Sequence, residues 1–377
     1  MKYKQRMVKN KVREYLKICL LCGLTMCLLL LSACSVLGGG TNAGTDNSAS
    51  TPTPVPTPTI APTMKDQGDM QLESFRTWIA LMKQYNGDTT QYQKQYDSDQ
   101  QALQNAKTET DFKKALATLN AHVDAIKLPA MKAELQGLQQ KLNQQVTSWG
   151  QQHQYHDPYN NTTYPLGYEY GTNGGVGSWS QDDLTSAKTL ADYQQAIENL
   201  NMYLTNFQAM TTDSSDTTPY NQPHATDLQL IQHYGKTSGG VVIVSLAEQA
   251  MRVYNDGKLV NAFQVTTGQP DLPTPPGVWW VEGKQSPTVF KSDEQPGGPH
   301  YYPPTPINYA MQYHSNGYFL HDSWWRADYG PHTNFPHPDA SGDSFSAQGS
   351  HGCVNLSKDN AAWLYNFVKV YTPVIIY

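Results

Sequence analysis

The pattern of apolar and polar residues divides the chain near position 212. Before that position, apolar side chains recur every three or four residues, the spacing that places them on one face of a helix. The clearest sets are Leu72, Phe75, Ile79 and Met82, followed by Phe112, Ala115, Leu116, Leu119 and Val123. Residues 66–212 are therefore predicted to form a helical domain.

This helical segment contains an internal repeat. Ala106-Lys107-Thr108 recurs as Ala187-Lys188-Thr189. At the same offset, Asp111, Ala115 and Leu119-Asn120 recur as Asp192, Ala196 and Leu200-Asn201. Each copy is predicted to be a helix, a short turn at Lys-Thr and a second helix, with Thr108 and Asp111 as helix-start signals. The domain is thus expected to be an antiparallel bundle of two related halves.

The segment between the two copies has a different composition. Residues 157–180 are rich in Gly, Tyr, Asn and Pro and are predicted to form a long loop. The tyrosines in and beside it are Tyr155, Tyr159, Tyr164, Tyr168 and Tyr170. They would either stack on sugars or pack as ordinary loop residues.

Strand patterns begin after a second linker, residues 213–227, which is rich in Ser, Thr, Asp and Pro. Val241–Leu246 is a continuous apolar run, and Asp256-Gly257 separates two apolar runs as a hairpin turn does. Further strands are predicted at Trp279–Val281, Ile307–Met311, Tyr318–Leu320 and Thr372–Tyr377, with a last helix capped by Ser357. Residues 228–377 should therefore be a mostly β domain with one main helix, which makes the protein a multidomain α and β chain.

Residues 1–33 are predicted to be a targeting segment. Basic residues precede an apolar run, Ile18–Leu31, that is short for a membrane-spanning helix. The run ends at Leu31-Ser32-Ala33-Cys34, which resembles a bacterial lipobox. That resemblance implies cleavage before Cys34 and lipidation of its thiol, so that the chain is anchored to the outer face of the cytoplasmic membrane. An uncleaved signal anchor is the alternative.

Residues 34–65 are dominated by Gly, Ser, Thr and Pro. Each proline fixes φ and removes a hydrogen-bond donor, so this stretch is predicted to be a semi-extended tether that reaches towards the cell wall.

Charge and cysteine content narrow the function. The net charge is -6 and becomes more negative without the basic signal segment, which argues against nucleic-acid binding. Three of the five cysteines, Cys19, Cys22 and Cys27, lie in the signal segment, and Cys34 would carry lipid. Cys353 is then the remaining free thiol.

Cys353 lies in the stretch Gly349-Ser350-His351-Gly352-Cys353-Val354-Asn355-Leu356, and His321 closes an apolar run upstream. A cysteine close to a histidine in space is sufficient for covalent acyl transfer. Gly352 permits an unusual φ or a close approach of the backbone, and successive N–H groups here could bind an oxyanion. The alternative is a buried, inert cysteine.

The stretch Ser350–Asn355 resembles the signature of the L,D-transpeptidase (YkuD-type) catalytic domain: Ser or Thr, His-Gly-Cys, an apolar residue, then Asn or Arg. Further resemblances lie upstream in the family's order, covering roughly residues 228–377. They are an opening hairpin (Val241–Leu246 and Met251–Lys258), a "TG…TPxG" segment (Thr266–Gly268 and Pro273–Gly277) and a histidine strand (Gly317–Asp322).

The resemblance implies cross-linking of peptidoglycan stem peptides without a cofactor or metal. A cysteine cleaves the terminal D-alanine from a stem tetrapeptide, and an amine of a second stem resolves the thioester. It also implies acylation by carbapenem-type β-lactams. The resemblance implies that Cys353 is the nucleophile, that His321 is the base and that the Asp322 carbonyl orients its imidazole. The N–H groups of His351, Gly352 and Cys353 would bind the oxyanion. His351 and Asn355 would shape the site, and Ser350 would make a local hydrogen bond.

Other functions remain open at this stage. Water as the acceptor would make the protein an L,D-carboxypeptidase, and an inert β domain would leave a wall-binding lipoprotein. A metal site built from His321, His332, His337, His351 and Cys353 has no regular zinc spacing. The interval from His321 to Ser350 is longer than is usual in the family, so His332 and His337 compete with His321 as the base. This inserted loop is predicted to form a mobile wall or a lid over the cysteine.

Overall fold

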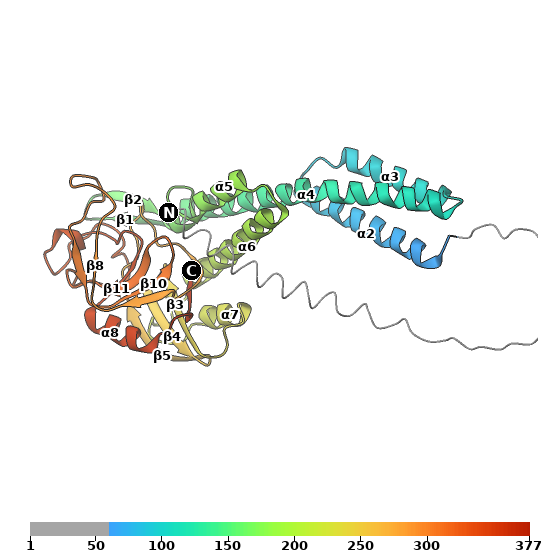
Figure 1. The fold of residues 1–377 in the computed structure, drawn as a ribbon. Coiled ribbons are helices and arrows are strands. Elements are labelled where there is room, and N and C mark those ends of the chain that lie inside the picture. Colours follow the sequence, from blue (N-terminus) through green and yellow to red (C-terminus); the bar gives the residue numbers. More distant parts are fainter. Residues whose placement is uncertain (1–59) are drawn as a thin grey trace, which may run out of the picture. The chain divides into compact units, whose positions relative to one another are not determined.

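The computed structural model describes residues 60–377 (Figure 1). The predicted signal segment, nearly all of the tether and the lipidation of Cys34 lie outside the described residues. Within the described residues, no helix is both long and apolar enough to cross a membrane.

The first three helices form a bundle with a core of its own. They are α2 (Pro62–Gln84), α3 (Thr90–Asn105) and the first part of α4 (Glu109–Gln152). The core residues are Leu72, Phe75, Ile79, Met82, Leu103, Phe112, Leu119, Val123, Ile126, Ala130 and Ala133. We call α2, α3 and residues 109–133 of α4 the distal bundle. The predicted tether extends too far, because α2 already begins at Pro62, where proline is favoured in the first turn.

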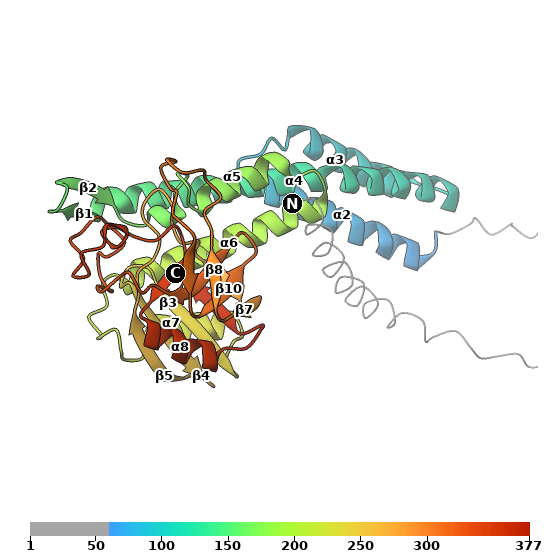
Figure 2. The same cartoon turned by 60° about the vertical axis from the view of Figure 1, so that its left-hand side comes forward.

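Helix α4 is 44 residues long and runs on past Pro129 to pack with α5 (Val176–Ser186) and α6 (Leu190–Asp213) (Figures 1 and 2). We call residues 135–152 of α4 together with α5 and α6 the proximal helices. Thr108 caps α4 and Thr189 caps α6, each accepting a hydrogen bond from the N–H group three residues later. The repeated residues therefore have equivalent capping roles, while a common origin of the two halves stays a prediction.

The predicted loop at residues 157–180 is largely regular structure, which corrects that expectation. Strands β1 (Gln154–Asp157) and β2 (Thr162–Pro165) form a hairpin, η1 (Tyr168–Tyr170) is a 3-10 turn, and α5 begins at Val176. The hairpin turn is stabilised by Asn160, whose side chain accepts from the Thr162 N–H and donates to the Tyr164 hydroxyl. Asn161 takes the positive φ of 56° that Asn tolerates in such a turn.

The predicted linker at residues 213–227 is shorter than expected. Helix α6 extends to Asp213, and a further helix, α7 (Ala225–His233), begins inside the predicted linker. Only residues 214–224 connect the two.

Two main sheets form the C-terminal domain. The five-stranded sheet has the order β5-β4-β3-β13-β6, and the four-stranded sheet has the order β12-β11-β10-β7. The strands of the first are β3 (Gly240–Ser245), β4 (Ala250–Asn255), β5 (Lys258–Gln264), β6 (Gly277–Trp280) and β13 (Pro373–Ile376). Those of the second are β7 (Gly283–Gln285), β10 (Ala310–His314), β11 (Tyr318–Asp322) and β12 (Val354–Leu356).

Smaller elements complete this domain. They are the strand pair β8 (Thr288–Phe290) and β9 (Thr305–Ile307), the turn η2 (Ser344–Ser346) and helix α8 (Lys358–Phe367). The predicted hairpin turn is confirmed, with φ of 49° at Asp256 and 73° at Gly257. Ser357 caps α8 as predicted, accepting a hydrogen bond from the Asn360 N–H.

The proximal helices share one continuous core with the β domain. The buried Asn206 of α6 donates to the Ile376 carbonyl at 2.9 Å, and Tyr234 donates to Asn206 Oδ1 at 2.6 Å. Fully buried side chains of this core include Leu135, Leu142, Leu200, Val242, Ile375 and Tyr377. Residues 66–212 therefore do not form one self-contained helical unit. Only the distal bundle has a core without residues of the β domain.

Candidate active site

A cavity of about 490 Å³ opens in the C-terminal domain and is lined by both Cys353 and His321. Three more predicted site residues, Ser350, His351 and Asn355, also line it. Strands β11 and β12 bring the two halves of this site together, because they pair in parallel with His321 opposite Asn355. Segments far apart in the sequence thus place a thiol and an imidazole on one cavity.

The backbone before the cysteine adopts a conformation that needs glycine. Gly352 has φ of +100°, and a Cβ atom there would lie 2.5 Å from Cε1 of Tyr318. The predicted reason for a glycine at this position is thereby confirmed. Cys353 follows this glycine, and strand β12 begins at the next residue, Val354.

His321 is buried and its ring is fixed at both nitrogens. Nδ1 donates to the Asp322 carbonyl at 2.9 Å, and Nε2 accepts from Asn355 Nδ2 at 3.0 Å. These two bonds define the tautomer with the proton on Nδ1. Burial lowers the pKa of His321 to about 4, so the imidazole is neutral at neutral pH and Nε2 can accept a proton.

The thiol of Cys353 is also neutral at rest. Burial raises its pKa to about 11, while the residue as a whole is partly exposed. Within residues 60–377, the hydrogen-bond acceptor of Sγ is the Gly317 carbonyl, at 3.9 Å.

We call residues 349–353 the cysteine loop. The upstream "TG…TPxG" segment holds this loop in place. The Ser350 N–H donates to the Thr267 carbonyl at 2.9 Å, and the Gln269 N–H donates to the Ser350 carbonyl at 3.0 Å. Thr274 Oγ1 accepts from the Gly268 N–H at 2.8 Å and donates to the Gly352 carbonyl at 2.9 Å. This resemblance to the family thus has a physical basis, because the segment forms the support on which the loop lies.

Ser350 makes the local hydrogen bonds expected of it. Its Oγ donates to the Cys353 carbonyl at 2.5 Å and accepts from the Gly352 N–H at 3.1 Å. One of the three predicted oxyanion donors, the Gly352 N–H, is thus already engaged. His351 is half-buried beside the rings of His300 and Tyr302, and burial lowers the pKa of its imidazole.

Asp322 anchors the end of strand β11 through its side chain as well as orienting His321 through its carbonyl. The fully buried carboxylate accepts from Asn308 Nδ2 and from the Tyr309 N–H, both at 2.7 Å. The imidazole is therefore attached to a rigid strand end.

The rival histidines of the inserted loop do not line this cavity. His332 stacks on Tyr155 of β1 with ring centroids 4.1 Å apart, and His337 Nδ1 donates to the Phe335 carbonyl at 2.7 Å. The same loop contains dense internal hydrogen bonds. Arg326 donates to the carbonyls of Ser346 and Gln348, and the Asp339 carboxylate accepts from three N–H groups.

Aromatic and proline residues form much of the cavity wall, and sequence reasoning did not single them out. They are Phe290, Tyr302, Pro303, Pro304, Pro306, Trp324, Trp325 and Phe345. Trp324 and Phe345 are exposed, at 56% and 45%. The one local signal was the Trp-Trp pair that closely follows His321, since exposed tryptophans often mark a binding surface.

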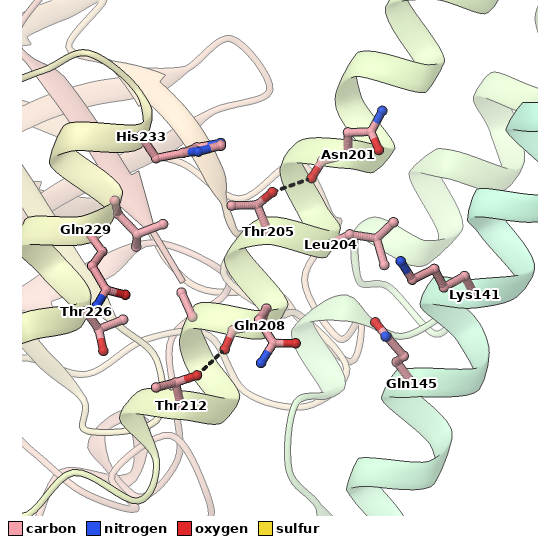
Figure 3. Close-up of a pocket in the computed structure, with 12 residues that line it drawn as sticks. Lys141, Gln145, Asn201, Leu204, Thr205, Gln208, Thr212, Thr226, Gln229 and His233 are labelled. Atoms are coloured by element: carbon pink, nitrogen blue, oxygen red, sulfur yellow. Dashed lines mark hydrogen bonds between the residues drawn. The ribbon is translucent and has the colours of Figure 1, made fainter.

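A second cavity, of about 590 Å³, lies between α4, α6 and α7 (Figure 3). Its lining consists mainly of amide, hydroxyl and aliphatic side chains, with Lys141 and His233 as the ionisable groups. Thr205 and Thr212 donate to carbonyls of their own helix. Its described lining contains no cysteine or carboxylate, so this cavity lacks the thiol–imidazole pair of the first one.

Of the residues considered for a metal site, His321, His351 and Cys353 line the first cavity, but His332 and His337 do not. Within the described part of the chain, ligand atoms cluster instead at Asp213, Asp216 and His224. His224 Nδ1 bonds to Asp213 at 3.0 Å, and Ser245 donates to the same carboxylate at 2.7 Å. These contacts explain the cluster as a polar network that joins the end of α6 to strand β3.

Comparison with known proteins finds relatives of the C-terminal domain. Residues 239–376 match the family model of the L,D-transpeptidase catalytic domain, YkuD. The C-terminal domain is similar to the L,D-transpeptidases. L,D-transpeptidase 1 of Mycobacterium tuberculosis is 27% identical over 142 residues, which span 35% of this chain and 48% of that protein. Probable L,D-transpeptidase 3 of the same organism is 28% identical over 29% of this chain and 36% of its own length.

Two solved structures are also similar to part of this chain. An L,D-transpeptidase from Mycobacterium smegmatis has 26% identity and a TM-score of 0.31, covering 37% of this chain and 59% of its own. The catalytic domain of the E. faecium L,D-transpeptidase has 30% identity and a TM-score of 0.30, covering 37% and 98%. The chain spans about half or less of the length of the curated relatives it matches. Residues 239–376 thus match a YkuD-type catalytic domain and fold as a β-rich domain.

Proposed function

We propose that this protein is a peptidoglycan L,D-transpeptidase that uses Cys353 as its nucleophile and His321 as its base. The observation that carries the proposal is the shared cavity: Cys353, the free thiol of the described residues, directly precedes strand β12, and the carbonyl-oriented imidazole of His321 lies on the adjacent parallel strand β11. The match of residues 239–376 to the L,D-transpeptidase domain supports the same reaction class.

The reaction begins with rotation of the Cys353 thiol from Gly317 towards His321. Nε2 takes the thiol proton as sulfur attacks the carbonyl that precedes the terminal D-alanine of the donor stem. Before this proton transfer, Asn355 must release Nε2, which it occupies in the resting site. A pKa of about 4 leaves Nε2 free of a proton beforehand, which is what a general base requires.

The developing oxyanion would be held by backbone N–H groups of the cysteine loop. The Gly352 N–H is held by Ser350 Oγ, so His351 and Cys353 are the neighbouring donors. Collapse of this intermediate breaks the C–N bond to D-alanine, and the proton on Nε2 passes to the leaving amine. The amine of a second stem then attacks the thioester, the C–S bond breaks, and the sulfur recovers a proton.

The experiment that tests this function is muropeptide analysis after incubation of the purified protein with disaccharide-tetrapeptides. Cross-linked dimers are expected with the wild type and none with Cys353→Ala. Trimmed monomers without dimers would instead identify an L,D-carboxypeptidase, and no product at all would fit a wall-binding protein without catalytic activity.

The identity of the base has matched controls in the same loop. His321→Ala should slow single-turnover acylation of Cys353 by about 10²-fold or more, the scale of a lost general base. His332→Ala and His337→Ala should acylate nearly as fast as the wild type, because neither ring lines the cavity. A carbapenem is a suitable acylating agent, since its strained amide offers the thiol a reactive carbonyl, and mass spectrometry measures the adduct.

We also propose that Cys34 is lipidated and that the segment before α2 tethers the enzyme to the outer face of the cytoplasmic membrane within reach of the wall. The sequence Leu31-Ser32-Ala33-Cys34 supports this. Fractionation should find the wild type with membranes and a Cys34→Ala variant in the soluble fraction. A variant that stays with membranes would point to an uncleaved anchor.

A further inference from the structure

Tyr168 connects the helical half of the chain to the support of the cysteine loop. It lies in η1, well before the residues that match the catalytic-domain family. Its hydroxyl donates to the Gly268 carbonyl at 2.6 Å and accepts from Asn334 Nδ2 at 2.8 Å. A single phenol thus joins the proximal region to two separate loops of the β domain.

From Gly268 a chain of hydrogen bonds leads to the nucleophile. The Gly268 N–H donates to Thr274 Oγ1, and Thr274 Oγ1 donates to the carbonyl of Gly352, the residue before Cys353. A Cβ atom on Gly268 would lie 2.2 Å from the Leu272 carbonyl, so this turn tolerates little displacement. The position of Gly268 is therefore transmitted to the cysteine loop.

The surroundings of Tyr168 are rigid on both sides. The buried ring of Phe335 contacts Tyr155, Tyr164 and Tyr168, with centroids 4.8, 5.1 and 5.9 Å away. Gly174, six residues after Tyr168, lies so close to Pro273 that an added Cβ would be 3.2 Å from its ring. The segment from β1 to the start of α5 thus holds the inserted loop and the Thr274 turn at the same time.

The phenol is in the right protonation state to donate. Burial raises the pKa of Tyr168 well above its usual value, so the hydroxyl keeps its proton across the range in which the enzyme would work.

We propose that Tyr168 is a positioning residue for the transpeptidase, which fixes the cysteine loop through Gly268 and Thr274. This inference rests on the proposed function. Its physical reason is the tolerance of acyl transfer: N–H donors must meet the oxyanion to within about half an ångström, and their support must be rigid.

The test compares Tyr168→Phe with Tyr164→Phe. Both tyrosines pack on Phe335, but the Tyr164 hydroxyl bonds within its own hairpin, to Asn160. Single-turnover acylation of Cys353 by a carbapenem is followed by mass spectrometry over a range of concentrations. In Tyr168→Phe the maximal rate constant should fall about tenfold, with the half-saturating concentration unchanged. Tyr164→Phe should stay within about twofold of the wild type.

A second pair of variants tests the same chain from its other end. Thr274→Val removes the hydroxyl that joins Gly268 to Gly352, while Thr274→Ser retains it. Thr274→Val should acylate slowly and Thr274→Ser should restore the rate. Relative to the wild type, the double variant Tyr168→Phe/Thr274→Val should be slowed by less than the product of the two single-variant factors, because both substitutions break the same chain of hydrogen bonds.

A wild-type acylation rate in Tyr168→Phe would overturn the positioning role. So would a double variant whose slowing equals the product of the two single-variant factors. Equal slowing in Tyr164→Phe would do so too, since it would show a general packing effect. Failure of the proposed function is distinguishable: a wild type that is acylated but yields no cross-linked dimers is not a transpeptidase, whatever Tyr168 does.

Discussion

The distal bundle and the proximal helices start from the same local signals and end with different partners. In each, a Lys-Thr turn leads into a helix capped by the threonine, Thr108 in one and Thr189 in the other. The distal bundle buries its apolar faces within itself. The proximal helices bury theirs on the β domain as well as on each other.

This difference shows that a helical pattern specifies a face but not its partner. Leu119 and Leu200 are equivalent in the repeat and both are fully buried, yet Leu200 belongs to the core shared with the strands. Polar contacts distinguish the proximal side, for example Asn206 donating to the Ile376 carbonyl. The proximal helices are also connected to η1, whose Tyr168 bonds to Gly268 beside the cysteine loop.

The largest expected effect comes from removing one region or the other. A fragment of residues 129–377 lacks most of the distal bundle and begins at Pro129, a residue suited to the first turn of a helix. It should be acylated at Cys353 within about twofold of the full chain. A fragment of residues 225–377 also lacks the proximal helices and exposes the core that α6 covers. It should be insoluble or acylate more than about 10²-fold slower, because misplaced reacting groups cost that much.

Carbapenem adduct formation by mass spectrometry and circular dichroism on both fragments provide the measurement. A well-folded, fully reactive 225–377 fragment would break the comparison, since both helical regions would then be dispensable appendages.

Features encoded within a few residues were predictable from the sequence. The Asp256-Gly257 turn, the Ser357 cap and the amphipathic faces of α2 and α4 all depend on neighbours along the chain. The orientation of His321 by the Asp322 carbonyl followed from the family resemblance and is what the structure shows.

Features that depend on distant contacts were missed. The β1–β2 hairpin has no alternating apolar pattern, and its tyrosines are held by Phe335 in the inserted loop. The Tyr168–Gly268 bond spans 100 residues. Such contacts form only once the whole domain has folded, so no local signal announces them.

A smaller effect is expected from Glu169, a carboxyl of the proximal side that is 3% exposed. Burial raises its pKa from 4.5 to about 7. Its contribution to stability is therefore fully present below about pH 4.5 and is lost as pH rises through about 7, with a total of about 3 kcal/mol. Glu169→Gln should flatten the fall in Tm across that interval, as measured by differential scanning calorimetry.

The control is Glu198→Gln, which alters an exposed carboxyl of α6 bonded to Gln194. It should leave the pH dependence of Tm as it is in the wild type. An unchanged slope in Glu169→Gln would show that this carboxyl is not the group that titrates.

The smallest effect is expected from the two equivalent caps. Thr108 Oγ1 accepts from the Asp111 N–H at 3.1 Å, and Thr189 Oγ1 accepts from the Asp192 N–H at 3.2 Å. Thr108→Ala and Thr189→Ala should each destabilise a helix start by about 1 kcal/mol, and Thr→Ser at either site should retain the cap.

The consequences of losing the two caps should differ between the distal bundle and the proximal helices. Thr108→Ala should speed hydrogen exchange in α2, α3 and the start of α4 alone, without slowing acylation of Cys353. Thr189→Ala should lower the Tm of the unit that contains the active site by about 2–4 °C. Identical exchange patterns for the two variants would mean that the distal bundle and the proximal helices unfold together, and the distinction between them would then be structural but not energetic.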